Sequence, residues 1–259
     1  MNLLKVTLGF SAIVAANAFA AMAITPAYDT FGPLSGATFG GSGISANAVA
    51  QVSNADLVLG LTVTSRFDST LNPVTNNGAG TFTALSGADI FAPSPADPYG
   101  RWNFNYFIGP GLGSTPGSSL GYSYRLFYDF NPAAGNMDTT HGTIAFPHLS
   151  LLLPINTTGF VPGQNSLNLG MNFLAVNANN GAYGVFAPSP SFTFNPSALG
   201  QYTFKLAAYT PVGSDVYGTQ VLSTSILVNV VPEPTEWAMM LTGLAAVAAL
   251  VRRRKRIER

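Results

Sequence analysis

The feature that most constrains the fold is an alternation of apolar residues with small or polar ones. In the clearest case Leu57, Leu59, Leu61 and Val63 recur at every second position. A period of two indicates a β-strand with one buried face, and enrichment in β-branched and aromatic residues agrees with this interpretation. The same pattern occupies six segments of the chain, which are 57–63, 102–108, 122–130, 167–173, 202–208 and 222–230.

Shorter strand candidates lie at residues 80–85, 143–153 and 191–195, and clusters of Pro and Gly separate the segments. No stretch between the two ends of the chain keeps a 3.6-residue period. Many strands with one polar face favour two packed sheets. We therefore predict an all-β fold, an antiparallel two-sheet sandwich of which a jelly-roll-like order is one form, in a single domain over residues 24–230.

Composition narrows the classes of function. The chain has 259 residues, of which 47% are hydrophobic, 8% are charged and none is cysteine. This apolar content excludes a disordered chain, and the lack of cysteine excludes disulfide scaffolds, cysteine-ligated zinc and thiol catalysis. Residues 24–231 hold eight acidic and four basic side chains, which argues against nucleic acid as a partner because phosphates need clustered Lys and Arg.

The first 23 residues read as a secretory signal peptide. Lys5 supplies a positive start, an apolar stretch follows, and small residues then stand at the spacing that signal peptidase accepts. We expect cleavage after Ala23, with Ala20 as the alternative. Secretion machinery and signal peptidase are therefore expected partners.

The other end carries an uncharged apolar run over residues 237–251, followed by a basic tail over 252–259. As a helix, fifteen residues reach roughly 22 Å, which is short for a hydrocarbon core of about 30 Å. We expect a short transmembrane helix whose basic end stays cytoplasmic. Its interface flanks are Trp237 on one side and, on the other, Arg252, Arg253, Arg254, Lys255 and Arg256.

Immediately before this run stand Pro232, Glu233 and Pro234. Each proline fixes φ and lacks a backbone N–H, and a residue that precedes proline is pushed towards extended geometry. The segment is therefore expected to be extended, with Glu233 as the recognition charge. The dipeptide chemistry alone would equally suit a rigid linker before an anchor.

The four parts in this order, Pro-Glu-Pro, an aromatic three residues on, an apolar helix and a basic cluster, resemble the PEP-CTERM sorting signal. The resemblance covers residues 231–256. It implies that an exosortase-type membrane protease recognises the tail, and that the source is a Gram-negative bacterium that makes exopolysaccharide or biofilm matrix. It also implies delivery to the cell surface or the extracellular matrix, with a C-terminal membrane anchor that is transient or retained.

One loop offers oxygen ligands of the kind that calcium takes, from Asp129, Asn131, Asn136 and Asp138. The spacing fails the EF-hand pattern, since Ala133 and Ala134 stand at ligand and glycine positions. Asx-turns explain the same residues without a metal, so we predict no metal and keep calcium as the alternative.

Signals for catalysis are weak. The stretch 117–121 matches G-x-S-x-G around Ser119, but a strand pattern follows it where a nucleophile elbow needs a helix. His141 and His148 match no zinc spacing. No glutamate precedes Glu233 in residues 24–232, so no acid pair of a glycosidase is indicated.

Six aromatic side chains could stack on sugar rings, but aromatics at a period of two are more often core. They are Tyr99, Trp102, Tyr106, Tyr122, Tyr124 and Tyr128. We predict a non-enzymatic exported surface or matrix protein without a cofactor, associated with exopolysaccharide. The alternatives are a carbohydrate-binding module, which would need an exposed row of aromatics, and a secreted hydrolase.

Overall fold

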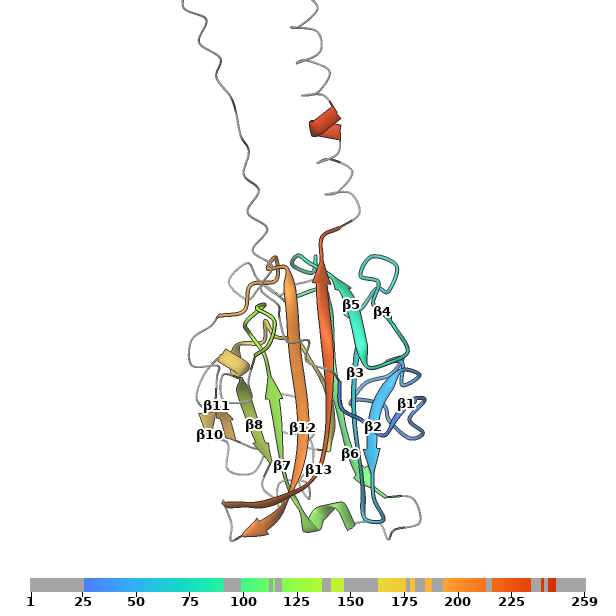
Figure 1. Cartoon of the computed structure of the whole chain (residues 1–259), viewed down its shortest axis with the longest axis vertical. Coiled ribbons are helices and arrows are strands. Elements are labelled where there is room, and N and C mark those ends of the chain that lie inside the picture. The colour runs from blue at the N-terminus through green and yellow to red at the C-terminus, as the bar shows by residue number, and fades with distance from the viewer. Residues whose placement is uncertain are drawn as a thin grey trace, which may run out of the picture.

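The structure is a computed structural model. It describes residues 26–90, 99–111, 114, 118–136, 141–146, 163–175, 178–179, 185–187, 193–212, 216–233, 239 and 242–245. Over these ranges the chain forms thirteen strands in two sheets, with only short helical turns (Figure 1). The prediction of an all-β, two-sheet architecture is confirmed.

The first sheet has five strands in the order β1-β2-β3-β6-β9. The strands are β1 (Thr30–Gly32), β2 (Val49–Ser53), β3 (Leu57–Ser65), β6 (Trp102–Pro110) and β9 (Gln164–Leu167). β3 and β6 pair along their whole length, from Leu57 opposite Pro110 to Ser65 opposite Trp102. β2 is shorter, and its pairing with β3 runs only as far as Ala50 opposite Leu61. Residues 62–65 of β3 therefore extend beyond the start of β2.

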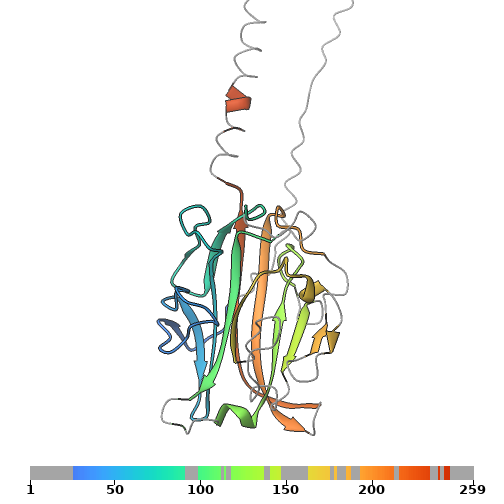
Figure 2. The same cartoon turned by 180° about the vertical axis from the view of Figure 1, so that it is seen from behind.

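The second sheet has eight strands in the order β10-β11-β8-β7-β12-β13-β5-β4. Their bounds are β4 (Thr75–Asn76), β5 (Thr81–Leu85), β7 (Ser123–Tyr128), β8 (Gly142–Phe146), β10 (Ala178–Asn179), β11 (Val185–Ala187), β12 (Gly200–Val212) and β13 (Val216–Val231). The long β12 and β13 are neighbours in the interior of this sheet and run side by side (Figure 1); Figure 2 shows the molecule from behind.

Aromatic side chains from both sheets meet between the layers. The rings of Phe104 on β6 and Phe204 on β12 stack with centroids 4.5 Å apart. The ring centroid of Trp102 lies 5.7 Å from that of Tyr202 and 5.9 Å from that of Phe204. The ring centroids of Tyr106 and Phe146 are 5.4 Å apart. Because such rings bury large apolar areas and add favourable pair geometry, this cluster holds the two sheets together.

One pairing departs from the predicted antiparallel arrangement. β5 runs parallel to β13, from Thr81 opposite Leu227 to Leu85 opposite Val231, while the other described pairs are antiparallel. The chain between them crosses into the first sheet and back, which supplies the long connection that parallel neighbours require. Alternation in sequence reports which face is buried and carries no information on strand direction.

The fourth predicted strand, over residues 167–173, is wrong. β9 ends at Leu167, and the chain then turns into the 3₁₀ helix η4 (Asn172–Ala175). Asn168 causes the break, because its Oδ1 accepts from the Gly170 N–H and its carbonyl accepts from the Met171 N–H. Side-chain bonds of this kind offer the backbone an alternative to the ladder.

The structure also differs from the expected short strand at residues 191–195 and from a jelly-roll order. Residues 193–195 form no strand, and residues 147–153 and 191–192 lie outside the described ranges. The thirteen described strands differ from the eight strands of a jelly roll. Sequence neighbours such as β2 and β3, β7 and β8, and β12 and β13 pair with each other.

Candidate functional site

The predicted sorting motif begins where β13 ends. Val231 is the last residue of β13, and its carbonyl accepts a hydrogen bond of 2.9 Å from the Ser86 N–H. Pro232 and Glu233 follow without a spacer, and Pro234 lies outside the described residues. The motif is thus attached directly to the central strand pair of the larger sheet.

Glu233 forms an ion pair with the guanidinium of Arg101, the residue before β6. The side chains are 30% and 19% exposed, so the pair lies partly inside the protein surface. Gly87 lies against the Arg101 side chain, and a Cβ at that position would approach Nε to 3.2 Å. The sequence indicated Glu233 as the recognition charge of the motif, whereas the fold gives it a partner from a distant segment.

The remaining parts of the predicted tail fall mostly outside the described residues. Trp237 and Arg252, Arg253, Arg254, Lys255 and Arg256 lie there, as does the signal peptide over residues 1–23. Of the apolar run over 237–251, only residue 239 and the helical residues 242–245 are described. In the described part of the chain, no helix has the length and apolar character needed to cross a membrane.

Three of the four calcium candidates come together after β7. The Asn136 Nδ2 donates to Asp129 Oδ2 at 2.7 Å, and the Asn131 Nδ2 donates to Asn136 Oδ1 at 3.0 Å. Backbone N–H groups of Asn131 and Thr203 also donate to the Asp129 carboxylate. The fourth candidate, Asp138, lies outside the described residues. Because amide donors already occupy the carboxylate, this geometry favours the Asx-turn interpretation.

Asp129 is 1% exposed, and burial raises the pKa of its carboxyl group, against the lowering by the Asn136 hydrogen bond and by nearby His141. His141 Nε2 lies 3.9 Å from Asp129 Oδ2. Across the described ranges, no three His, Asp or Glu side chains gather as a metal site would require.

Ser119 lies in η1 (Ser118–Gly121), and β7 follows it. The Ser119 carbonyl accepts a hydrogen bond from the buried Tyr124 hydroxyl. A helical turn before a strand is the reverse of the strand-turn-helix order of a nucleophile elbow. His148 lies outside the described residues.

The six aromatic candidates are mainly core. Trp102, Tyr106, Tyr124 and Tyr128 are at most 3% exposed, while Tyr99 and Tyr122 are half-buried. The expectation that these side chains belong to the interior is confirmed for the four buried rings.

An exposed aromatic occurs where the sequence gave no sign of one. Phe67 is 71% exposed and has a φ of 54°, in the left-handed region that a bulky side chain rarely adopts. Its position continues the phase of the inward residues of β3, so alternation would place it in the core. The positive φ at the strand's end turns the ring outwards instead.

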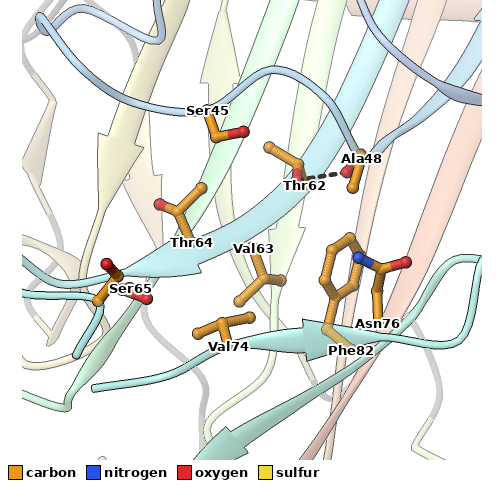
Figure 3. A pocket seen from close by; sticks show the side chains of 10 residues that line it. Ser45, Ala48, Thr62, Val63, Thr64, Ser65, Val74, Asn76 and Phe82 are labelled. Carbon is orange, nitrogen blue, oxygen red and sulfur yellow. Dashed lines mark hydrogen bonds between the residues drawn. The ribbon is translucent and has the colours of Figure 1, made fainter. Parts of the chain in front are cut away.

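The largely exposed Phe67 is one of the residues that line a hollow of about 700 Å³. The hollow is bounded by the loop 42–45, the end of β3, and residues Asn103 and Ser166 of β6 and β9. It shares Ser45, Thr64, Ser65 and Ser69 with a neighbouring hollow of about 220 Å³, which Figure 3 shows. In that view Val63, Val74 and Phe82 lie below Ser45, Thr62 and Thr64.

Comparison with models of protein families, with curated proteins and with solved structures found no match.

Proposed function

We propose that the chain is an exported, non-enzymatic protein of the cell surface or biofilm matrix, associated with exopolysaccharide and sorted by a C-terminal signal of the PEP-CTERM type. The observation that carries the proposal is the direct succession of β13 and Pro232-Glu233. The last strand of the domain ends at Val231, which immediately precedes Pro232 of the motif. A protease acting on the motif would therefore release a complete domain.

The order of segments along the sequence supports the same function. A signal-like start, a β domain, Pro-Glu-Pro, an apolar run and a basic cluster follow one another. In this proposal signal peptidase and the secretion machinery act first. An exosortase-type membrane protease then acts on the tail while the basic end remains cytoplasmic. The apolar run serves as a transient or retained transmembrane helix.

The test is the mass of the protein recovered from cells that contain an active exosortase. Glu233→Ala, or substitution of Pro232 and Pro234, should leave export intact and block tail removal, so that the uncut chain stays in the membrane fraction. Glu236→Ala provides a matched control, because it removes a tail carboxylate outside the motif. Recovery of the wild-type chain with its sequence intact through Arg259 would leave a simple C-terminal anchor and refute sorting.

A carbohydrate-binding module is the second candidate function, and the hollow beside Phe67 is the observation that favours it. The exposed row of aromatics that such a module would need is not found among the described strands, where the aromatic side chains that the structure describes are buried or half-buried. Association with polysaccharide through this domain therefore needs a different surface.

A further inference from the structure

The hollow beside Phe67 lies over the first sheet, where Thr64 of β3, Asn103 of β6 and Ser166 of β9 line it. β2 pairs with β3 no further than Leu61, so residues 62–65 have β6 as their only described strand neighbour within the sheet. The chain before β2 reaches across this sheet, because the Thr38 and Phe39 N–H groups donate to Gln164 Oε1 on β9. Its Ser42–Ser45 segment lines the hollow together with the sheet. Residues 62–65, as an edge segment, present polar groups that a ligand can pair with.

Hydroxyl groups occur on six of the twelve lining residues, which are Ser42, Ser45, Thr64, Ser65, Ser69 and Ser166, and Ile44, Phe67 and Met171 add apolar surface. The Asn103 amide lies among them and donates from Nδ2 to Ser166 Oγ at 3.0 Å. Each hydroxyl can both donate and accept, so the surface can match a ligand that is itself rich in hydroxyl groups.

Two buried polar atoms, one on the lining residue Arg66 and one on Asn105 next to the lining residue Thr64, have no hydrogen-bond partner among the described residues. Arg66 lines the hollow and is 7% exposed, and its Nε is unpaired. Asn105 is fully buried beside Thr64, to which its Nδ2 donates at 3.0 Å, and its Oδ1 is unpaired. Buried polar atoms are normally paired, and each exception needs an explanation.

The Arg66 guanidinium lies over two aromatic rings, 4.4 Å from the centroid of Phe67 and 4.3 Å from that of Tyr99. This stacking fixes the Phe67 ring beside the hollow while most of its surface stays in solvent. Strained backbone of the kind at Phe67 is concentrated at functional sites, where the surrounding structure maintains it. Arg66 thus supports the ring and lines the hollow at the same time.

We propose that this hollow binds a short saccharide segment, with ring faces stacked on Phe67 and hydroxyl groups bonded to the Ser, Thr and Asn side chains. The volume falls within the range of about 300–1,000 Å³ that ligand pockets occupy. The lining includes Arg66 but no Asp, Glu or Lys. A neutral or carboxylate-bearing sugar fits this lining, and a sugar carboxylate would share the Arg66 charge with Asp89.

The inference deepens the proposed association with exopolysaccharide and rests on it. What it adds is the location of the binding site. The test therefore distinguishes failure of this site from failure of the proposed association. The probes are cello-oligosaccharides, which are neutral, and polygalacturonate oligosaccharides, which carry a carboxylate on each ring. Calorimetric titration of the full chain in mild detergent gives an affinity for each probe.

The wild-type chain should bind at least one of the two probes. Phe67→Ala should weaken that binding at least tenfold, and Phe67→Trp should restore it, since a stacking ring is returned. Thr64→Val keeps the shape of the wall and should also weaken binding, by several fold. Ile90→Ala is the matched control, because Ile90 is 70% exposed and does not line the hollow, and its affinity should be that of the wild type.

Two outcomes overturn the proposal in different ways. If the wild-type chain binds a probe and Phe67→Ala and Thr64→Val bind it equally well, the saccharide site lies elsewhere and the association with polysaccharide stands. If the wild-type chain binds neither probe, the hollow is not a saccharide site. Co-sedimentation of the protein with matrix polysaccharide isolated from cells then decides whether the association itself also fails.

Discussion

Arg101 and Glu233 are 132 residues apart in sequence, and their side chains form an ion pair at the end of β13 where the chain leaves the fold. The central residue of the Pro-Glu-Pro motif is therefore docked on the domain that precedes it. In the proposed function, a protease must first separate this pair before it can bind the Glu233 carboxylate.

Replacing Arg101 with Met should speed removal of the tail. A partly exposed ion pair contributes about 0.2–1 kcal/mol, which corresponds to at most about a fivefold larger fraction of undocked motif. Pulse-chase conversion of the uncut chain measures the rate. Lys205→Met removes a cation on β12 and should leave the rate unchanged. Slower conversion of Arg101→Met than of this control would show that the pair presents the motif to the protease.

Asn168→Asp should destabilise the fold severely, although the two side chains have nearly the same shape. The Asn168 Nδ2 donates to Gly100 O, Trp102 O and Asn103 Oδ1 at 2.8–2.9 Å, and the residue is fully buried. A carboxylate cannot donate to these oxygens and would bury an unpaired charge, at a cost of about 3 kcal/mol or more.

Urea denaturation of the wild-type protein and of Asn168→Asp measures the loss in free energy of unfolding. Asn165→Asp is the control, because Asn165 accepts through Oδ1 from the Ser166 N–H and a carboxylate preserves that bond. Equal unfolding midpoints for the two variants would mean that the Asn168 amide is not the organising group of this turn.

Calcium should leave the melting temperature unchanged. Asp129, Asn131 and Asn136 satisfy one another through N–H donors, so a cation would have to displace these bonds. A site filled at a hundred times its dissociation constant would add about 2.7 kcal/mol. Thermal melts in excess calcium, in excess magnesium and in chelator provide the comparison. A rise specific to calcium would mean that Asp138 completes a site.

Stability should fall above about pH 10 through the buried tyrosines. Burial raises the pKa of Tyr202 to about 12 and raises those of Tyr106, Tyr124 and Tyr128 above the ordinary value of 10.0. The unfolded chain loses these protons first, so their contribution is complete below pH 10 and decreases as pH rises through the folded values.

Ultraviolet titration of the folded protein checks this prediction. The buried phenols should ionise only together with loss of the β-sheet circular dichroism signal. Full tyrosinate absorbance in a protein that retains this signal would contradict it.

Much of the fold could be predicted because alternation reports burial directly. The segments around Leu59, Phe104, Phe204 and Val228 alternate, and each forms a strand with these residues in the core. The segment from Leu167 to Phe173 alternates as well, but Asn168 bonds its own backbone and ends the strand. A side-chain bond of this kind leaves no periodic signal.

Candidate sites that are defined by neighbouring residues could be predicted from the sequence, whereas those that depend on the tertiary structure could not. Pro232-Glu233 could be found from sequence because the motif is local, whereas its partner Arg101 could not, since the ion pair depends on how β6 and β13 are placed. Phe67 shares the phase of Leu57 to Val63, so its exposure depends on one backbone dihedral angle. The hollow depends on how the loop before β2 reaches across the first sheet to β9, which alternation does not encode.

The position of β13 also determines how the protein would bear force. This strand is flanked by β12 on one side and β5 on the other, and its last residue leads straight into the tail. Tension transmitted from a tethered tail would act along the strand, at right angles to the bonds of the antiparallel ladder with β12. The hydrogen bonds of β13 with β12 and with β5 are then loaded in shear. Many of them must break at the same time, instead of one after another. A domain tethered in this way could withstand drag from a flowing medium without losing its fold.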